Sequence, residues 1–223
     1  RSSAASDVYK RQVPNLFNVG GVTSASGRAI QWLAESGAPK PTAVKTAVEC
    51  GATAPAGARR SLFLPYLLGE RTPNWNPRAS AAFLGLTIRH DWNDMARAVL
   101  ESVGFAIRAI IDILAENGCP VERMTTCGGP SRFAPWNQIK ADITGVPVQT
   151  LVNPEADLVG CACVALAAEG YFEDLSGAAK ALVRPGQEYQ PDSSLSDLYG
   201  DLFDTYQDTF QELDVNPNEG LAA

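Results

Sequence analysis

The sequence predicts an α/β fold whose late strands are parallel, and three observations indicate it. Residues 121–170 alternate between short strands and helical segments, an order typical of parallel strands joined by crossover helices. Residues 95–117 carry apolar side chains almost all round, which predicts a helix buried on several sides. The chain has 223 residues and is 45% hydrophobic, enough for one large domain or two small ones with an extensive core.

Composition and charge exclude several classes of function. Charged residues make up 19% of the chain, the net charge is −7, and Lys and Arg do not cluster beyond Arg59 and Arg60. Nucleic-acid binding needs a basic surface, so we expect no nucleic-acid partner. No apolar run approaches the roughly 20 residues that span a bilayer, so we expect no membrane partner either.

The five cysteines are odd in number and scattered along the chain, which argues against a disulfide framework. They are Cys50, Cys119, Cys127, Cys161 and Cys163. We expect most of them to be small buried residues. A reducing compartment fits this pattern best, so the sequence favours a cytoplasmic protein.

Both ends of the chain differ from the part between them. Residues 1–12 are polar and aperiodic, and we interpret them as a non-native or disordered tail, with the true protein truncated near its boundary. The predicted domain spans residues 13–213. Residues 214–223 carry no periodic pattern and are expected to fray.

The first predicted elements are short and mixed. Residues 13–23 can form either a strand or a loop. Ser24 is a suitable N-cap for a helix over residues 25–35, and a shorter helix is expected at residues 42–49. The apolar residues 62–64 predict a short buried strand.

A loop with little periodicity follows at residues 65–82, and its three prolines make it stiff. Such a polar and aromatic loop beside a core strand usually lines a site, and Trp75 is the tryptophan most expected to be exposed. Asn93 or Asp94 is the expected N-cap of the long helix at residues 95–117.

Two strand–helix units form the late part of the chain. The first has a strand at residues 121–127, a glycine turn, and a helix that ends at Gly145. The second has a strand at residues 146–152 and a helix at residues 156–168. Because the strands alternate with helices, they are expected to be parallel neighbours.

The C-terminal part is predicted to be helical. A short helix starts at Leu175, and residues 187–192 read as a linker that contains a proline. Ser194 then caps a clearly amphipathic helix whose apolar residues form one stripe, with an acidic and polar opposite face. This stripe predicts that the helix packs against the body of the domain.

Gly128 and Gly129 form the turn between the first late strand and its helix. Backbone N–H groups at such a turn, with the partial positive charge of a helix N-terminus, can hold a phosphate. The spacing is neither a P-loop nor a dinucleotide fingerprint. On spacing alone, a tight turn that needs glycine for backbone reasons is the slightly better explanation.

Several motifs, in the right order, resemble the FGGY family of carbohydrate kinases. The segments AAFLGL (81–86) and DMARAVLE (94–101), separated by seven residues, are similar to the second signature of that family. The segment PYLLGERTP (65–73) is similar to the preceding loop of xylulokinases and gluconokinases. Residues 128–147 are similar to the strand, turn and helix of the family's adenosine site. The resemblance covers about residues 13–213.

The resemblance implies an actin-like ATPase (ribonuclease-H-like) domain, a mixed sheet flanked by helices, that forms the C-terminal half of a two-domain kinase. Family members transfer a phosphoryl group from ATP, with Mg²⁺, to a sugar or polyol hydroxyl in the cleft between the domains. The implied substrate is a pentulose, gluconate or a similar sugar. The implied partner is a missing N-terminal domain of the same polypeptide, and a homodimer stays open.

The resemblance also implies a set of nucleotide-binding residues. Gly27 and Gln31 match the Gly-x-x-x-Gln that contacts nucleotide in the related glycerol kinases, and Gly129 matches the glycine that packs on the adenosine. Two positions depart from the pattern, because Pro130 lacks an N–H group and Phe133 replaces an adenine-contacting Asn. Stacking or backbone contact is therefore expected for the adenine. The implied set is Gly27, Gln31, Gly128, Gly129, Pro130, Ser131 and Phe133.

We expect no catalytic residue in this chain. The family's general base is an Asp upstream of the matching region, and no Asp here matches it. Asp94, Asp112 and Asp142 lie on predicted helices, where capping, solvation or packing explains them better than catalysis. With one histidine and scattered cysteines there is no metal constellation, so Mg²⁺ would arrive with ATP.

Other interpretations stay open. The chain can be a non-catalytic module of the same fold, or an unrelated α/β nucleotide-binding or coenzyme-binding domain. The last would gain support if the first helix and the Gly128 turn lay on opposite sides of the fold. Glu70 and Arg71 either brace the domain interface or approach the sugar, or they form a loop ion pair that contributes about 0–1 kcal/mol.

Overall fold

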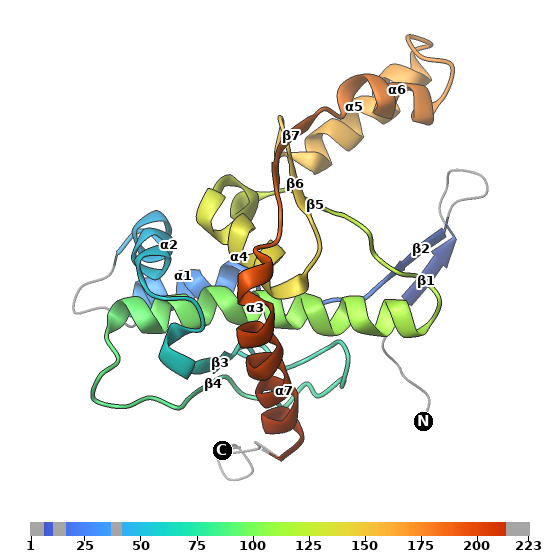
Figure 1. Ribbon diagram of the computed structural model, residues 1–223. Coiled ribbons are helices and arrows are strands. Elements are labelled where there is room, and N and C mark those ends of the chain that lie inside the picture. Colours follow the sequence, from blue (N-terminus) through green and yellow to red (C-terminus); the bar gives the residue numbers. More distant parts are fainter. Residues whose placement is uncertain (1–6, 11–16, 37–41, 213–223) are drawn as a thin grey trace, which may run out of the picture.

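The computed structural model describes residues 7–10, 17–36 and 42–212, and its central element is the helix α3 (Trp92–Glu116). Figure 1 shows α3 crossing the middle of the molecule. Every residue from 96 to 106 is buried, so three turns of this helix have no solvent-facing side. The prediction of a helix buried on several sides is confirmed.

A capping box begins α3 earlier than predicted. The Asp91 carboxylate accepts the N–H groups of Asn93 (2.8 Å) and Asp94 (3.1 Å). In return, the Asp94 carboxylate accepts the N–H of Asp91 at 3.1 Å. The prediction of Asn93 or Asp94 as the N-cap is therefore wrong, because Asp94 is the third helical residue and supplies the returning half of the box.

The strands of the described residues form three small sheets. The first two are antiparallel pairs, and the third has β6 between a parallel and an antiparallel neighbour. The predicted parallel pairing of the late strands is confirmed for β5 and β6. The strands are β1 (Asp7–Lys10), β2 (Phe17–Gly20), β3 (Leu62–Leu64), β4 (Ala82–Leu84), β5 (Met124–Thr126), β6 (Val148–Leu151) and β7 (Pro185–Tyr189).

Helices and strands pack around α3. In Figure 1, α2 and α4 lie above α3, β3 and β4 lie below it, and α5 and α6 project away at the top. The helices are α1 (Gly27–Ser36), α2 (Val44–Thr53), α4 (Ala134–Thr144), α5 (Ala156–Ala168), α6 (Leu175–Leu182) and α7 (Ser196–Glu212). Short 3-10 helices are η1 (Ala58–Arg60), η2 (Gly129–Arg132) and η3 (Ser193–Leu195).

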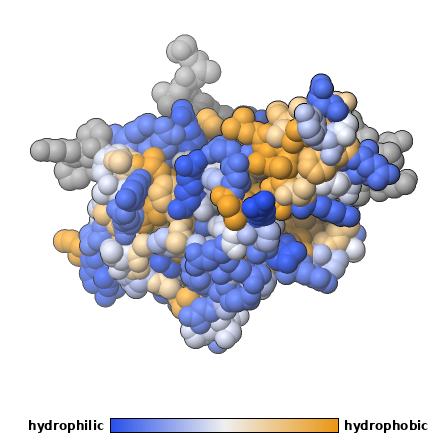
Figure 2. All heavy atoms as spheres, turned by 90° about the horizontal axis from the view of Figure 1, so that it is seen from above, coloured by the Kyte–Doolittle hydropathy of each residue, from blue (hydrophilic) through white to orange (hydrophobic). Residues whose placement is uncertain are grey.

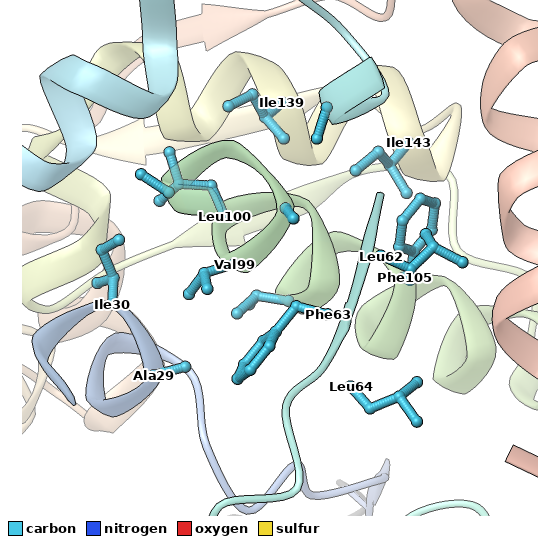
Figure 3. Packing of buried hydrophobic residues seen from close by; sticks show 14 of the residues in the cluster. Ala29, Ile30, Leu62, Phe63, Leu64, Val99, Leu100, Phe105, Ile139 and Ile143 are labelled. Atoms are coloured by element: carbon cyan, nitrogen blue, oxygen red, sulfur yellow. The ribbon is translucent and has the colours of Figure 1, made fainter. Parts of the chain in front are cut away.

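One apolar core joins α1, β3, α3, α4 and α7. Figure 3 shows Ile30 of α1, Phe63 of β3 and Val99 of α3 within this cluster. All three residues of β3 are buried, as the sequence predicts. Trp136 of α4 is fully buried and donates its indole N–H to the Leu100 carbonyl at 3.0 Å, which fixes α4 against α3.

A buried polar cluster attaches α7 to α3. One carboxylate oxygen of Glu101 accepts hydrogen bonds from the Arg97 guanidinium (2.6 Å), the Tyr199 hydroxyl (2.9 Å) and the Gly57 N–H (2.8 Å). Arg97 also donates to the Tyr199 hydroxyl at 2.8 Å. Because Glu101 is only 1% exposed, these partners compensate a charge that is removed from water.

The predicted tails lie partly outside the described residues. Residues 1–6, 11–16 and 213–223 are not described, so fraying at the C-terminus stays a prediction. Asp7–Lys10, however, forms strand β1, so the expected disorder does not apply to these four residues. The non-native origin of the first twelve residues also stays a prediction.

The cysteines and the apolar surface differ from expectation. Cys119, Cys127 and Cys161 are exposed and only Cys163 is buried, so the prediction of mostly buried cysteines is wrong. The reason lies partly in α5, which is apolar on all sides yet exposes Leu158 and Val164. Figure 2 shows apolar residues gathered on part of the face seen from above.

Candidate functional site

The start of α1 and the turn after β5 lie in direct contact, although about 100 positions separate them in the sequence. A Cβ atom built on Gly27 would lie 3.2 Å from Cγ of Pro130. The absence of a side chain at Gly27 therefore lets the first turn of α1 approach the turn closely. The arrangement that would have supported an unrelated fold, with these two segments on opposite sides, is not observed.

Gly128 is required by the backbone. Its φ of +75° lies in the left-handed region, where glycine carries no steric cost. Its N–H donates to the Pro154 carbonyl at 2.7 Å, which ties the turn to the segment before α5. The backbone conformation alone explains why glycine occupies position 128, and the N–H of Gly128 is not free for a ligand.

Gly129 is required by neither backbone nor packing. Its φ is not positive, it is exposed, and a Cβ built on it would meet no atom within 4 Å. Its N–H has no acceptor among the described residues. A glycine without a structural reason, at an open turn with a free donor, is what close approach of a ligand to the backbone requires.

The rest of the turn uses its donors internally. Pro130 has no N–H, and both the N–H (3.2 Å) and the hydroxyl (2.7 Å) of Ser131 donate to the Gly128 carbonyl. The carbonyl of Ser131 accepts the Asn137 side-chain amide at 2.7 Å. Ser131 is therefore a brace for the turn, and Gly129 offers its only unused backbone donor.

Phe133 and Gln31 are committed to neighbouring protein groups. Phe133 is half-buried and packs against the main core, which leaves only part of its ring for an adenine. Gln31 donates to Glu35 at 2.8 Å and accepts from Arg28 at 3.5 Å along the exposed face of α1. These exposed contacts are weak enough to exchange for a ligand.

A cavity of about 220 Å³ lies between the start of α1, the turn, β5 and α4. Its polar lining includes Ser26 of the α1 approach, Thr125 and Thr126 of β5, and Lys140 of α4. Ile107 of α3 and the strand residues Met124 and Val148 supply apolar lining. The cavity therefore continues the surface of the turn into the domain.

Lys140 is the most perturbed charge at this site. It is 5% exposed, and burial lowers the pKa of its ammonium from 10.5 to about 8. It donates to the Asn137 amide oxygen at 3.3 Å and lies 5.0 Å from the centroid of the Trp136 ring. Sequence reasoning missed this residue, whose only signal was its place between Trp136 and Ile143 on one side of a predicted helix.

Two of the three aspartates expected on helices, Asp94 and Asp142, have structural partners. Asp94 belongs to the capping box and pairs with Arg59 at 3.2 Å. Asp142 accepts the Gln138 amide at 2.7 Å and the Asp192 N–H at 2.9 Å, which links α4 to the segment before η3. In the described ranges, His, Cys, Asp and Glu form no group of three that could hold a metal ion.

A second, smaller cavity of about 140 Å³ lies under the stiff loop. Its buried Glu70 accepts the N–H of Asn74 at 3.0 Å, and burial raises the pKa of this carboxyl. Glu70 and Arg71 form no ion pair with each other in the described structure. Glu70 braces the loop, and Trp75 at 61% exposure confirms the predicted exposed tryptophan.

Comparison with known proteins gives consistent matches. A sequence profile of the FGGY family of carbohydrate kinases, C-terminal domain, matches residues 2–169. The chain is similar to the xylulose kinase of Staphylococcus epidermidis, with 27% identity over 205 residues, 92% of this chain and 41% of that protein. Within the described ranges, no helix combines the length and apolar character needed to cross a bilayer.

Solved structures agree with this match. The xylulose kinase from Rhodospirillum rubrum superposes with a TM-score of 0.82 and 32% identity, covering 96% of this chain and 43% of that one. The gluconate kinase from Lactobacillus acidophilus superposes with a TM-score of 0.80 and 27% identity, covering 94% and 42%. The chain therefore spans less than half the length of the relatives that it matches.

Proposed function

Because the chain belongs to the FGGY family of carbohydrate kinases, we propose that it supplies the nucleotide-binding half of an enzyme that phosphorylates a sugar with ATP. The observation that carries this proposal is the contact between Gly27 and Pro130, which joins the two segments assigned to the nucleotide. A pentulose or gluconate is the proposed substrate class, because the similar proteins are named xylulose kinases and a gluconate kinase.

The residues of the turn have distinct proposed roles. The adenosine lies against Gly129, where the absence of a side chain leaves open space, and beside Gly27, whose missing side chain lets Pro130 approach. The free N–H of Gly129 donates to the ribose or to the first phosphate. Gln31 exchanges its contacts with Arg28 and Glu35 for the nucleotide, and the exposed part of Phe133 contacts the base.

The Mg²⁺ ion of the reaction is proposed to enter with ATP. The described residues contain no cluster of acidic, histidine or cysteine side chains suited to hold it. Oxygen ligands from phosphates and water are what Mg²⁺ prefers, and it commonly keeps several waters. This chain therefore positions the nucleotide, and the metal lies at the phosphate end of the cleft.

The general base and most sugar contacts are proposed to lie in a further domain of the same cytoplasmic polypeptide. The proton of the attacking sugar hydroxyl needs an acceptor within hydrogen-bond reach. Asp94 and Asp142 are engaged in a cap and in a link between elements. The chain alone should therefore bind nucleotide weakly and transfer no phosphoryl group.

Calorimetric titration of ADP and ATP into this chain tests the nucleotide part of the proposal. We expect measurable binding that Gly129→Ala weakens, with Gly160→Ala as a matched control, because this exposed glycine of α5 also has no positive φ and no atom within 4 Å of a built Cβ. Absence of nucleotide binding, or sugar phosphorylation by this chain alone, would contradict it. The complete reading frame, assayed with ATP against a panel of sugars, separates a kinase from a non-catalytic module.

A further inference from the structure

The cavity beside the turn contains hydroxyl groups that no protein group uses. Ser26, Thr125 and Thr126 line it, and none of their hydroxyl groups makes a hydrogen bond within the described structure. Ser26 and Thr126 are half-buried, whereas Thr125 is exposed and alternates with Thr126 along β5. A hydroxyl in protein normally finds a partner in protein or solvent. The unused hydroxyl groups of Ser26 and Thr126 are therefore available as donors to a ligand in this cavity.

Lys140 adds a charge to this set. Its ammonium has three N–H donors, of which one is used by the Asn137 amide oxygen at 3.3 Å, while the Trp136 ring faces the charge at 5.0 Å. Lys140 forms no ion pair with any carboxylate of the described residues. A buried cation without an anionic partner is costly, and a bound anion would remove that cost.

The lining of the cavity suits an oxyanion. It contains no aspartate or glutamate, so no carboxylate opposes a negatively charged ligand. Its volume of about 220 Å³ accommodates a phosphate group with space for water. Ammonium and hydroxyl groups are the donors that phosphate oxygens accept, and charge-assisted hydrogen bonds are the strong ones.

We propose that this cavity is a phosphate-binding site in which Lys140 is the charged donor and Ser26 and Thr126 are hydroxyl donors. The phosphate group belongs either to a nucleotide held at the adjacent turn or to free inorganic phosphate. The nucleotide source rests on the proposed function, whereas the inorganic source does not. In either case Lys140 contacts the ligand directly.

A structural role of Lys140 must be separated from this contact. The Lys140 ammonium fixes the orientation of the Asn137 amide, whose nitrogen then donates to the Ser131 carbonyl at 2.7 Å. Removal of Lys140 could therefore disturb the turn and weaken every ligand there. Adenosine, which has no phosphate, distinguishes the two roles, because only disturbance of the turn reduces its binding.

The test is isothermal titration calorimetry of the chain with inorganic phosphate, ADP and adenosine. Lys140→Met removes the charge at nearly constant volume, and Lys140→Arg retains it. Lys180→Met, on the exposed face of α6, removes a lysine charge far from the cavity as a matched control. If Lys140→Met does not fold, Lys140→Gln, which is neutral but retains an N–H donor, carries the same expectation.

We expect Lys140→Met to lower the affinity for ADP or phosphate at least tenfold, while adenosine binds as in the parent chain. Lys180→Met should leave all three affinities unchanged. ADP weakened beside unchanged adenosine assigns the site to the nucleotide. Phosphate binding that depends on Lys140, in a chain that binds no nucleoside, supports the site and contradicts the proposed function. Equal losses for ADP and adenosine, or no effect of Lys140 on any phosphate ligand, would overturn the proposal.

Discussion

The Gly27 Cα and the ring of Pro130 approach so closely that a methyl group on Gly27 would lie 3.2 Å from Cγ of the proline. At this distance the neighbour must move by a few tenths of an ångström. The turn carrying Pro130 is braced by Ser131 and Asn137, so it has little room to retreat. The contact therefore sets the width of the proposed nucleotide site.

Replacement of Gly27 by Ala should separate stability from binding. Alanine is the better helix former by about 1 kcal/mol, which offsets the cost of the tight contact, so the free energy of unfolding should change by less than about 1 kcal/mol. Nucleotide affinity should fall, because the methyl group occupies the junction. Urea denaturation and ADP titration measure the two effects. A variant that binds ADP normally would argue against a nucleotide at this junction.

The two glycines of the turn should respond in opposite ways. Gly128→Ala forces a side chain into φ +75° and ψ −167°, a combination almost restricted to glycine, and should lower the free energy of unfolding by about 1–3 kcal/mol. Gly129→Ala meets no atom within 4 Å and should leave stability unchanged while weakening ADP. Thermal unfolding and ADP titration of both variants check this. A destabilised Gly129→Ala would show that this glycine is structural.

Elements whose conformation is set by the local sequence pattern could be predicted from the sequence, whereas elements set by pairing with distant residues could not. The helix α5 has the predicted bounds, 156–168, because an almost wholly apolar run, with Asp157 in its first turn, ends at turn residues on both sides. Strand β7 lies at Pro185–Tyr189, where the sequence has no apolar alternation. Its strand conformation comes from hydrogen bonding to β6. No local pattern of side chains predicts this pairing.

In the candidate site, too, local sequence predicted some features, whereas others depend on tertiary packing. Gly128 and Gly129 were found from a strand, a turn and a helix in succession, but only the structure shows that the backbone requires one and not the other. Lys140 was not predicted as a site residue, because lysines on helices are usually exposed. Its burial arises from the packing of α4 on α3 and on the sheet. Its place beside apolar residues of the predicted helix is only a weak signal, and the tertiary packing decides that its charge is buried.

Titration of Lys140 should make stability rise with pH. Its pKa is about 8 in the folded chain and 10.5 when unfolded, so between these values the unfolded state binds more protons. The loss of stability that comes from burying the charged ammonium of Lys140 is fully present below pH 8 and disappears toward pH 10.5. It amounts to about 3 kcal/mol of the free energy of unfolding.

The measurement for Lys140 is the difference in free energy of unfolding between the parent chain and Lys140→Met, from pH 7 to pH 10. Other titrating groups, such as Tyr66, whose pKa is raised by burial, cancel in this difference. The free energy of unfolding of the parent chain should increase relative to that of Lys140→Met as the pH rises. A difference that does not change with pH would mean that Lys140 is hydrated in solution.

The buried carboxylate of Glu101 should be the most sensitive single position of the fold. Arg97→Met removes the guanidinium at 2.6 Å and leaves a charge that is 1% exposed with only the Tyr199 hydroxyl and the Gly57 N–H. Breaking one partner of a buried pair costs about 3–5 kcal/mol, because the other charge stays uncompensated. Urea denaturation should show this loss directly.

A surface pair of the same sequence spacing is the control for Arg97 and Glu101. Lys45 and Glu49 also lie four residues apart on a helix, at 3.7 Å, but both side chains are exposed. Glu49→Ala should therefore change the free energy of unfolding by less than about 1 kcal/mol. The double variant Arg97→Met with Glu101→Leu should recover much of the stability lost in Arg97→Met, because it removes the orphaned charge and fills the space with apolar atoms. If it recovers nothing, the loss in Arg97→Met comes from packing, and the charge on Glu101 is not what attaches α7 to α3.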